Sequence, residues 1–426
     1  MGAVSVAWRG KGLLNLARRA GAIGKRYGLG PRRMEGRLVA FHRILERYGG
    51  RPTFPVTAVA VARNPDAFLR FAALDVEFAV HGYYHVDHAE LPADVQVEQF
   101  GRAKRLLEAK GVSPVGFRAP YLRWNGGTME ALRAGGFLYD SSQAMGYPID
   151  PALETDDYRR ALAFYGAVPA EERPVVPSLL DGLVRIPCCL PDDEALVDRL
   201  GVRSPRSIAR LWLDMFQTSH QREELLTLQV HPERIEACGD GIIAVLEAAH
   251  VARPGVWVAS LEEIARWWRR RTRTRVEVRD TGPGRIHVTV RGPEGVTLLA
   301  RGLKVAGAEP WVGAYRRLRG SDVELHVDRR PIVGIHPSSP DTVGAFLREQ
   351  GYITEVSSEP HLYSCFVGQE RFSGQDERSL LRRIERDGSP LLRLSRWPDG
   401  TRSAVSVTGD VDALSIWDYA LRAVGR

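Results

Sequence analysis

The sequence predicts an α/β protein with parallel strands, and a (β/α) barrel is one form that this class takes. Two observations support the prediction. Short apolar segments alternate with amphipathic helical segments from residue 33 to residue 271, which is typical of parallel strands joined by helices. The chain has 426 residues, 44% of them hydrophobic and 26% charged. This composition is typical of globular domains and excludes wholesale disorder.

Periodicity and helix-breaking residues give the elements of the first half in order. The segment 33–50 has the pattern of a helix that ends at Gly49 and Gly50. Alternating strands and helices then follow. They are the strand Thr53–Val61, the helix Asn64–Ala73, the strand Val76–Val80, the helix 95–111, the strand Pro114–Arg118, the helix 128–137 and the strand Leu138–Asp140.

The same alternation continues to residue 271, after which the hydrophobic pattern of the sequence changes. We expect strands over 183–191 and 225–232, with helices around Ser204–Ser219 and over 260–271. Residues 272–332 alternate apolar and polar positions between Gly/Pro turns, which predicts a small antiparallel β module. Residues 333–399 begin as a small α/β segment. Residues 400–426 supply the strand Ser403–Val407, a polar turn and a final helix.

Charge and cysteine content limit the partners and the compartment. Lys and Arg number 59 against 52 Asp and Glu, a net charge of +7 that suits anionic partners without selecting one. The Arg-rich stretch 269–275 has no nucleic-acid-binding module beside it, so we predict no nucleic acid partner. Four cysteines without Cys-x-x-Cys spacing indicate reduced thiols and a cytoplasmic protein. No apolar run is long enough for a transmembrane segment, and we expect the basic segment 1–28 to be a surface helix.

Two histidines follow the predicted strand Val76–Val80, in the motif His81-Gly-Tyr-Tyr-His85. On a helical turn, a spacing of four places both imidazoles on one face, where they can chelate a divalent metal. Chemistry in α/β folds sits at the carboxyl ends of strands, which favours this position. The alternative interpretation is a histidine-rich surface turn.

A pair of carboxylates, Asp410 and Asp412, follows the strand Ser403–Val407. Two residues apart at a strand end, they can face the same way, so that one binds metal and the other takes a proton. Asp87 and Glu90 are candidate ligands closer in sequence to the histidines. Alternatively, Asp412 caps the final helix.

Two more polar residues stand at predicted strand ends. Arg118 precedes Ala-Pro-Tyr121, and His231 ends the apolar strand 225–232. Taken singly, a surface salt bridge explains Arg118, and a hydrogen-bonded histidine in a turn explains His231.

Together these four pieces resemble the NodB-type polysaccharide deacetylases of carbohydrate esterase family four. Family members carry an Asp motif, then H-S/T-x-x-H, then R-x-P-Y, and late in the domain a strand that ends in histidine. His81–His85 resembles the second motif, with Gly82 where the family usually has Ser or Thr. Arg118–Tyr121 resembles the third motif and Val230–Pro232 the last. The resemblance covers residues 35–268 and 400–426 and implies a (β/α) barrel-like NodB domain.

The Asp motif departs from the family order, because the family carries it on the first strand. Here the first strand, Thr53–Val61, has no acidic residue, and Ser403–Asp412 resembles the missing piece. We therefore predict a circularly permuted deacetylase domain formed by residues 1–271 and 400–426, with 272–332 and 333–399 inserted before the C-terminal strand. Alternatively, the Asp strand comes from a neighbouring protomer, or it begins an incomplete second copy.

The resemblance implies a metal-dependent N-deacetylase that acts on N-acetylhexosamine-containing glycans or lipid-linked sugars. The implied ligands of a divalent metal are Asp412, His81 and His85, with Zn²⁺ expected first and Co²⁺, Mn²⁺ or Ni²⁺ as alternatives. The implied catalytic residues are Asp410 as general base, Arg118 as its orienting partner, His231 as general acid and Tyr121 as the donor of a backbone N–H to the oxyanion.

Two alternatives keep this fold and change the activity. One is a catalytically degenerate carbohydrate-binding or scaffold protein. The other is a hydrolase of a non-sugar amide. Homo-oligomers remain an open alternative to a monomer.

Overall fold

A closed barrel of seven parallel strands is the centre of the molecule. The computed structural model describes residues 26–318 and 320–423. Pairing between β4 and β7 joins the two ends of the sheet and closes the barrel. In order around it lie β4 (Tyr139–Gly146), β3 (Gly116–Phe117), β2 (Glu77–Val80), β1 (Thr53–Val56), β20 (Ser403–Thr408), β8 (Leu225–Gln229) and β7 (Leu183–Leu190). The predicted (β/α) barrel is confirmed.

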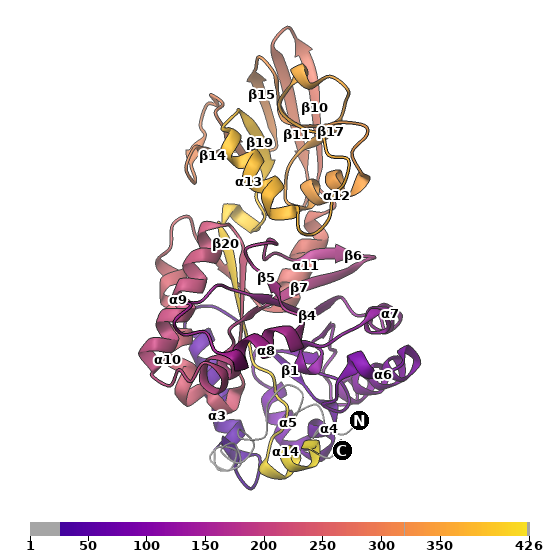
Figure 1. Ribbon diagram of the computed structural model, residues 1–426, viewed down its shortest axis with the longest axis vertical. Coiled ribbons are helices and arrows are strands. Elements are labelled where there is room, and N and C mark those ends of the chain that lie inside the picture. The colour runs from indigo at the N-terminus through magenta and orange to yellow at the C-terminus, as the bar shows by residue number, and fades with distance from the viewer. Residues whose placement is uncertain (1–25, 319, 424–426) are drawn as a thin grey trace.

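Helices surround the barrel (Figure 1). They are α3 (Arg32–Glu46), α4 (Ala58–Arg63), α5 (Pro65–Ala72), α6 (Ala93–Glu108), α7 (Gly126–Ala134), α8 (Asp156–Tyr165), α9 (Pro205–Gln221), α10 (Ile235–Val251), α11 (Leu261–Arg271) and the final α14 (Ile416–Ala423). Short strands extend the sheet as β5 (Val168–Pro169), β6 (Ser178–Leu180) and β9 (Val256–Val258). Short helical turns are η1 (His88–Glu90), η2 (Pro120–Leu122), η3 (Ala195–Arg199), η4 (Pro232–Arg234), η5 (Pro360–Leu362) and η6 (Pro398–Gly400).

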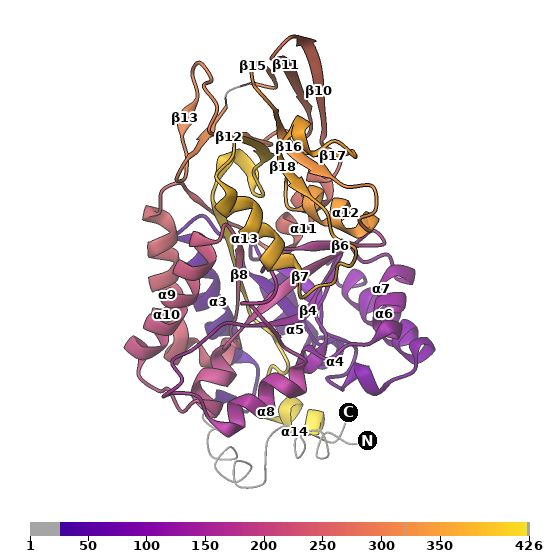
Figure 2. The ribbon, with the colours of Figure 1, turned by 45° about the horizontal axis from the view of Figure 1, so that its top comes forward.

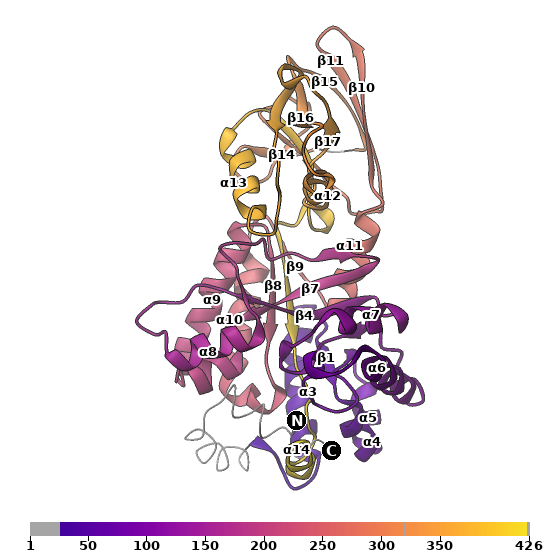
Figure 3. The same ribbon diagram turned by 45° about the vertical axis from the view of Figure 1, so that its right-hand side comes forward.

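The last strand of the chain, β20, lies between strands from its first 230 residues. It pairs in parallel with β8 over Ala404–Thr408 and with β1 at Thr53, and Figure 3 shows it beside β8. All six residues of β20 are buried. The chain's own β20 thus fills the position between β1 and β8. Circular permutation of the family order remains a prediction.

The two ends of the described chain meet. The backbone N–H of Ile416 donates to the carbonyl of Gly28 at 3.0 Å. The rings of Tyr27 and Tyr419 lie 5.1 Å apart. These contacts place the C-terminal helix against the segment that leads into α3, as a permuted domain would require.

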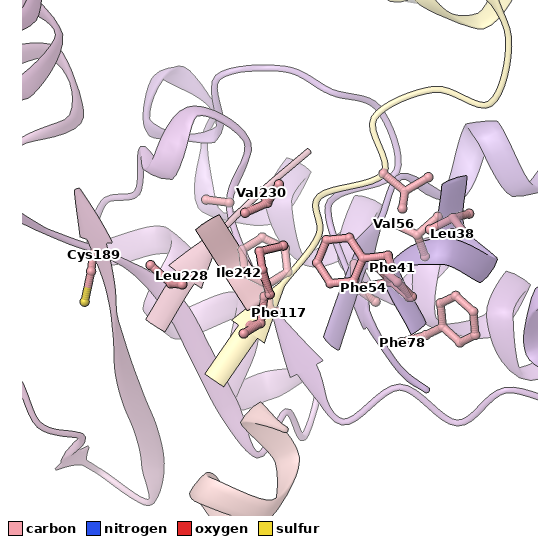
Figure 4. Close-up of a cluster of buried hydrophobic side chains, with 14 of the residues drawn as sticks. Leu38, Phe41, Phe54, Val56, Phe78, Phe117, Cys189, Leu228, Val230 and Ile242 are labelled. Carbon is pink, nitrogen blue, oxygen red and sulfur yellow. The ribbon is translucent and has the colours of Figure 1, made fainter. Parts of the chain in front are cut away.

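Aromatic and aliphatic side chains from α3 and the strands form the main core (Figure 4). The ring of Phe54 lies 5.3 Å from that of Phe41 and 6.3 Å from that of Phe78. Leu228 and Val230 of the β8 segment pack in the same cluster. Burial of this apolar surface holds α3 and the strands together and fixes where the strands end.

A second region, residues 272–399, lies beyond one end of the barrel (Figures 1 and 2). One sheet contains β10 (Arg275–Gly282), β11 (Arg285–Arg291) and β15 (Asp322–His326). A second contains β13 (Glu309–Pro310), β14 (Tyr315–Arg317), β12 (Leu298–Arg301) and β19 (Leu391–Leu394). A third contains β17 (Thr354–Val356), β16 (Arg330–Ile335) and β18 (Tyr363–Val367). The helix α12 (Asp341–Glu349) lies between β16 and β17 in the sequence, and α13 (Glu377–Asp387) follows β18. Because β12 pairs with β19, the two predicted inserts share a sheet. Their division into separate units stays a prediction.

Two local expectations were wrong. The predicted strand Thr53–Val61 ends at Val56, and Ala58–Arg63 is the helix α4. The apolar segment 53–61 has no hydrophobic periodicity that would distinguish a buried strand from a buried helix. The chain turns at Thr57, where the Ala58 N–H donates to Gly82 O at 3.1 Å. His81 and His85 also lie in a loop rather than on a helical turn.

Two remaining predictions concern cysteines and membranes. All four cysteines are free and buried. Within residues 26–318 and 320–423 there is no helix whose length and apolar character would let it cross a bilayer. The surface helix predicted for residues 1–28 falls almost entirely outside the described residues.

Candidate metal centre and active site

Four strands of the barrel bring the predicted site residues together at their carboxyl ends. His81 follows β2, Arg118 follows β3, Asp410 comes after β20 and His231 after β8. Because parallel strands end at the same edge of the barrel, His81, Asp410 and His231 line one pocket, and the buried Arg118 pairs with Asp410. The helix α14 lies at this end of the barrel (Figure 1).

The two histidines point their Nε2 atoms at one carboxylate. His81 Nε2 and His85 Nε2 each lie 3.4 Å from Asp412 Oδ1. His81 Nδ1 lies 2.8 Å from the carbonyl oxygen of Arg118. This contact makes Nδ1 the protonated nitrogen and leaves the Nε2 lone pair for a metal.

His81, His85 and Asp412 fit a divalent metal ion. Two ligands that each lie about 2.1 Å from a tetrahedral ion are about 3.4 Å apart, as the nitrogens are from Asp412 Oδ1. All three residues are buried, and their ligand atoms lie within 4.8 Å of one another. Asp412 Oδ1 is buried without a hydrogen-bond donor. An uncompensated buried carboxylate oxygen is costly, so a cation is its natural partner.

Asp410 is held by two donors. Arg118 Nη1 donates to Asp410 Oδ1 at 2.7 Å, and Gln229 Nε2 donates to Asp410 Oδ2 at 2.9 Å. Arg118 is fully buried and also donates to Thr408 Oγ1 and to the carbonyl of Ser141. Burial lowers the pKa of Arg118, but the Asp410 charge outweighs it and raises that pKa above its ordinary range. The carboxylate of Asp410 therefore has one fixed orientation, with Oδ2 3.9 Å from His81 Nε2.

His231 is paired with an aspartate that the sequence did not single out. Its Nδ1 lies 2.8 Å from Asp193 Oδ1, and its backbone N–H donates to Asp193 Oδ2 at 3.0 Å. Burial lowers the pKa of His231, but Asp193 outweighs it and raises the pKa well above its ordinary value. Asp192, Asp193 and His231 also form a cluster that could hold an ion. However, both Asp193 oxygens already contact His231. This arrangement favours a hydrogen-bonded pair in which His231 keeps its proton over a site for an ion.

Tyr121 lines the same pocket on the turn η2. Its backbone has φ of 60°, a conformation that non-glycine residues rarely adopt. Such strain persists where the surrounding structure fixes it, and it is common at functional sites. Tyr121 forms part of the pocket wall beside His85. The rings of these two residues lie 4.6 Å apart.

Arg422 of α14 is another residue that sequence reasoning missed. Its Nη1 pairs with Asp412 Oδ2. Burial raises the pKa of Asp412, but Arg422 and the two histidines outweigh it and hold the pKa well below its usual range. The space that the pocket residues enclose is about 30 Å³, enough for an ion or a water molecule.

The alternatives for the third ligand lie elsewhere. Asp87 accepts a hydrogen bond from Arg123 at 2.6 Å, and Glu90 lies 3.6 Å from the same arginine. The helix α14 begins at Ile416, so Asp412 is too early to cap it. Ser415 Oγ instead accepts from the Asp418 N–H at 3.2 Å.

Gly82, the departure from the family motif, has a local explanation. Its φ is +77°, and a Cβ there would come within 2.6 Å of His88 Cε1. His88 is fully buried and packs 5.1 Å from the ring of Phe100. The core histidine therefore occupies the space that a Ser or Thr side chain would need.

Comparison with known proteins identifies the segment that carries the histidines. Residues 30–139 match the family model for polysaccharide deacetylases. This segment, about a quarter of the chain, is therefore similar to the polysaccharide deacetylase family. Members of the family are hydrolases that act on amide bonds. The match includes His81, His85, Arg118 and Tyr121 but not Asp410 and Asp412, which lie near the C-terminus.

Individual relatives cover only parts of the chain. The peptidoglycan deacetylase-like protein FGM2 of Gibberella zeae is 33% identical over 116 residues, 26% of this chain and 31% of that protein. The chain thus spans about a third of the length of this curated relative. A crystal structure from Mycobacterium smegmatis, assigned as a polysaccharide deacetylase, is 25% identical with a TM-score of 0.42 and covers 56% of this chain and 77% of its own. One from Pseudomonas aeruginosa PAO1, with the same assignment, is 22% identical with a TM-score of 0.43 and covers 56% and 73%.

Proposed function

We propose that this protein is a metal-dependent N-deacetylase that removes acetyl groups from N-acetylhexosamine residues of a glycan or a glycan intermediate. One observation carries the proposal. Asp412, near the C-terminus, lies 3.4 Å from both His81 and His85 in a pocket that Asp410 also lines, and Asp410 is paired with the buried Arg118. A metal-ligand set beside an oriented carboxylate is the arrangement that hydrolysis by an activated water requires.

Asp412, His81 and His85 would hold the divalent ion, for which zinc is our first choice because imidazole and carboxylate ligands suit it. When bound, the ion would supply Lewis acidity that makes water a better nucleophile near neutral pH and polarises the acetamide carbonyl.

Asp410 is the general base of the proposed reaction. Arg118 donates a hydrogen bond to one of its oxygens and Gln229 to the other, and together they keep Asp410 oriented toward the histidines. It removes a proton from the attacking water as the carbon–oxygen bond forms.

His231 is the general acid. Asp193 holds its Nδ1 and keeps the imidazole protonated, because it raises the pKa. His231 Nε2 gives its proton to the nitrogen as the carbon–nitrogen bond breaks, and the products are acetate and a free amine. The backbone N–H of Tyr121 would stabilise the negative charge that develops on the carbonyl oxygen.

The test is acetate release by the purified full chain loaded with zinc. We expect release from N-acetylglucosamine oligomers, loss of at least about 100-fold in rate for Asp410→Asn, and no change for the exposed control Asp214→Asn. If zinc binds but only a non-sugar acetamide is cleaved, the sugar substrate is wrong. If neither is cleaved and no metal binds, the protein is a degenerate member of the family.

A further inference from the structure

The outer face of α14 is apolar and exposed at the active-site end of the molecule. Trp417 and Leu421 are 65% and 37% exposed, and Ala420 between them is exposed as well. Positions i, i+3 and i+4 share one helix face, so these side chains form a stripe. Leu29, which is 79% exposed, lies next to it in the structure, because the carbonyl of Gly28 accepts from the Ile416 N–H. We call Leu29, Trp417, Ala420 and Leu421 the apolar tip.

The apolar tip adjoins the pocket. Arg422, directly after Leu421, lines the pocket and pairs with Asp412. In all three views α14 lies at the end of the barrel that is far from residues 272–399 (Figures 1, 2 and 3). A flat surface that contacts the apolar tip would therefore face the entrance to the active site.

The sequence that leads to the apolar tip is strongly basic. The first 34 residues contain eight cations and no carboxylate, and the first acidic residue is Glu35. The structure places the end of this basic segment, Arg26–Gly30, beside α14, since Tyr27 contacts Tyr419. Arg32 is exposed at the start of α3. Exposed Trp and Leu flanked by cations form the pattern of an interfacial membrane site, in which aromatic and aliphatic groups enter the headgroup region and cations attract anionic lipids.

We propose that the apolar tip docks this protein on the surface of an anionic lipid bilayer. Trp417, Leu421 and Leu29 enter the interface, and Arg32 at the start of α3 lies near the acidic headgroups. Docked in this way, the pocket faces the membrane surface. If the proposed deacetylase function holds, the substrate is a glycan presented there on a lipid. The docking itself does not depend on that function.

The test is co-sedimentation of the full chain with vesicles of phosphatidylcholine alone and with 30% phosphatidylglycerol. We expect binding to the anionic vesicles, weaker binding at high salt because the attraction is screened, and little binding to the neutral ones. The double variant Trp417→Ser/Leu421→Ser should bind at least about 10-fold more weakly. The matched control Val356→Ser/Leu362→Ser removes two exposed apolar residues from the other region and should bind like the native chain.

Three results would overturn the proposal. One is the absence of binding to anionic vesicles. Another is unchanged binding of the Trp417→Ser/Leu421→Ser variant, which would show that the apolar tip does not contact the lipid. The third is a dimer, seen by analytical ultracentrifugation, that this variant dissociates, because the apolar tip would then be an interface between two copies. Acetate release from soluble oligomers, measured in parallel, separates failure of docking from failure of the enzyme.

Discussion

The His231–Asp193 pair gives a prediction at the scale of single residues. Asp193 raises the pKa of His231, so the imidazole stays protonated at higher pH than an isolated histidine. In Asp193→Asn the charge is lost and the pKa falls. We expect the alkaline limb of the kcat/KM profile to move to lower pH, and kcat to fall by about 100-fold. A pH profile with an unchanged alkaline limb would contradict the role of Asp193.

His88 gives a second prediction, one of stability. Its side chain is fully buried between Phe100 and Phe117. Burial lowers its pKa from 6.5 to about 3. The unfolded chain therefore binds a proton below pH 6.5 that the folded chain resists. The free energy of unfolding should fall as pH drops from 6.5 toward 3, by at most about 1.4 kcal/mol per pH unit.

In His88→Leu this contribution disappears. Urea unfolding between pH 7.5 and 4.5 should show a shallower loss of stability for His88→Leu than for the native chain. The exposed control His361→Leu should keep the native slope. Equal slopes in the native chain and His88→Leu would show that His88 is protonated in the folded state.

At the scale of elements, the helix α14 competes with metal for Asp412. Arg422 Nη1 pairs with Asp412 Oδ2 and supplies the positive charge that an ion would otherwise supply. Replacing Arg422 by Gln removes this competitor, so we expect zinc to bind about 10-fold more tightly. Competition with a chromophoric chelator measures the affinity. The control is Arg63→Gln. Arg63 lies 3.6 Å from Asp418, another acidic residue of this C-terminal segment, in α14. Weaker zinc binding in Arg422→Gln would contradict the competition.

The elements that the sequence predicted correctly are those whose pattern is long or whose position is fixed by topology. The helices α6, α9 and α11 carry clear periodic apolar faces. Residues at the ends of β2, β3, β8 and β20 could be grouped in advance because parallel strands end at one edge. The extent of the first strand could not, since Thr53–Arg63 is apolar without a decisive period.

The residues that were missed act through partners far away in the sequence. Asp193 is 38 residues from His231, and Gln229 is 181 residues from Asp410. Asp193 lies three residues after the end of β7, so the strand-end rule that found His231 could have found it. Arg422 carries no such signal, because an arginine on an amphipathic final helix is usually a solvated surface residue.

At the scale of the whole molecule, β20 completes the barrel from the far end of the chain. Residues 27–28 contact residues 416–419, so a short linker can join residue 423 to residue 26, and new ends can be opened between Thr401 and Arg402. We expect this rearranged chain to unfold cooperatively and to bind zinc like the native one, because every barrel contact is kept. A control opened inside α6, between Gly101 and Arg102, should not fold. Loss of folding in the first chain alone would contradict the permuted-domain account.

We propose that one ion links distant parts of the chain through Asp412, His81 and His85. Elemental analysis of the purified full chain, dialysed after loading with zinc, tests this most directly. We predict one zinc per native chain and per Asp214→Asn control, and less than about a tenth of that for Asp412→Asn. A native chain without zinc, or an Asp412→Asn chain that keeps all of it, would contradict the account.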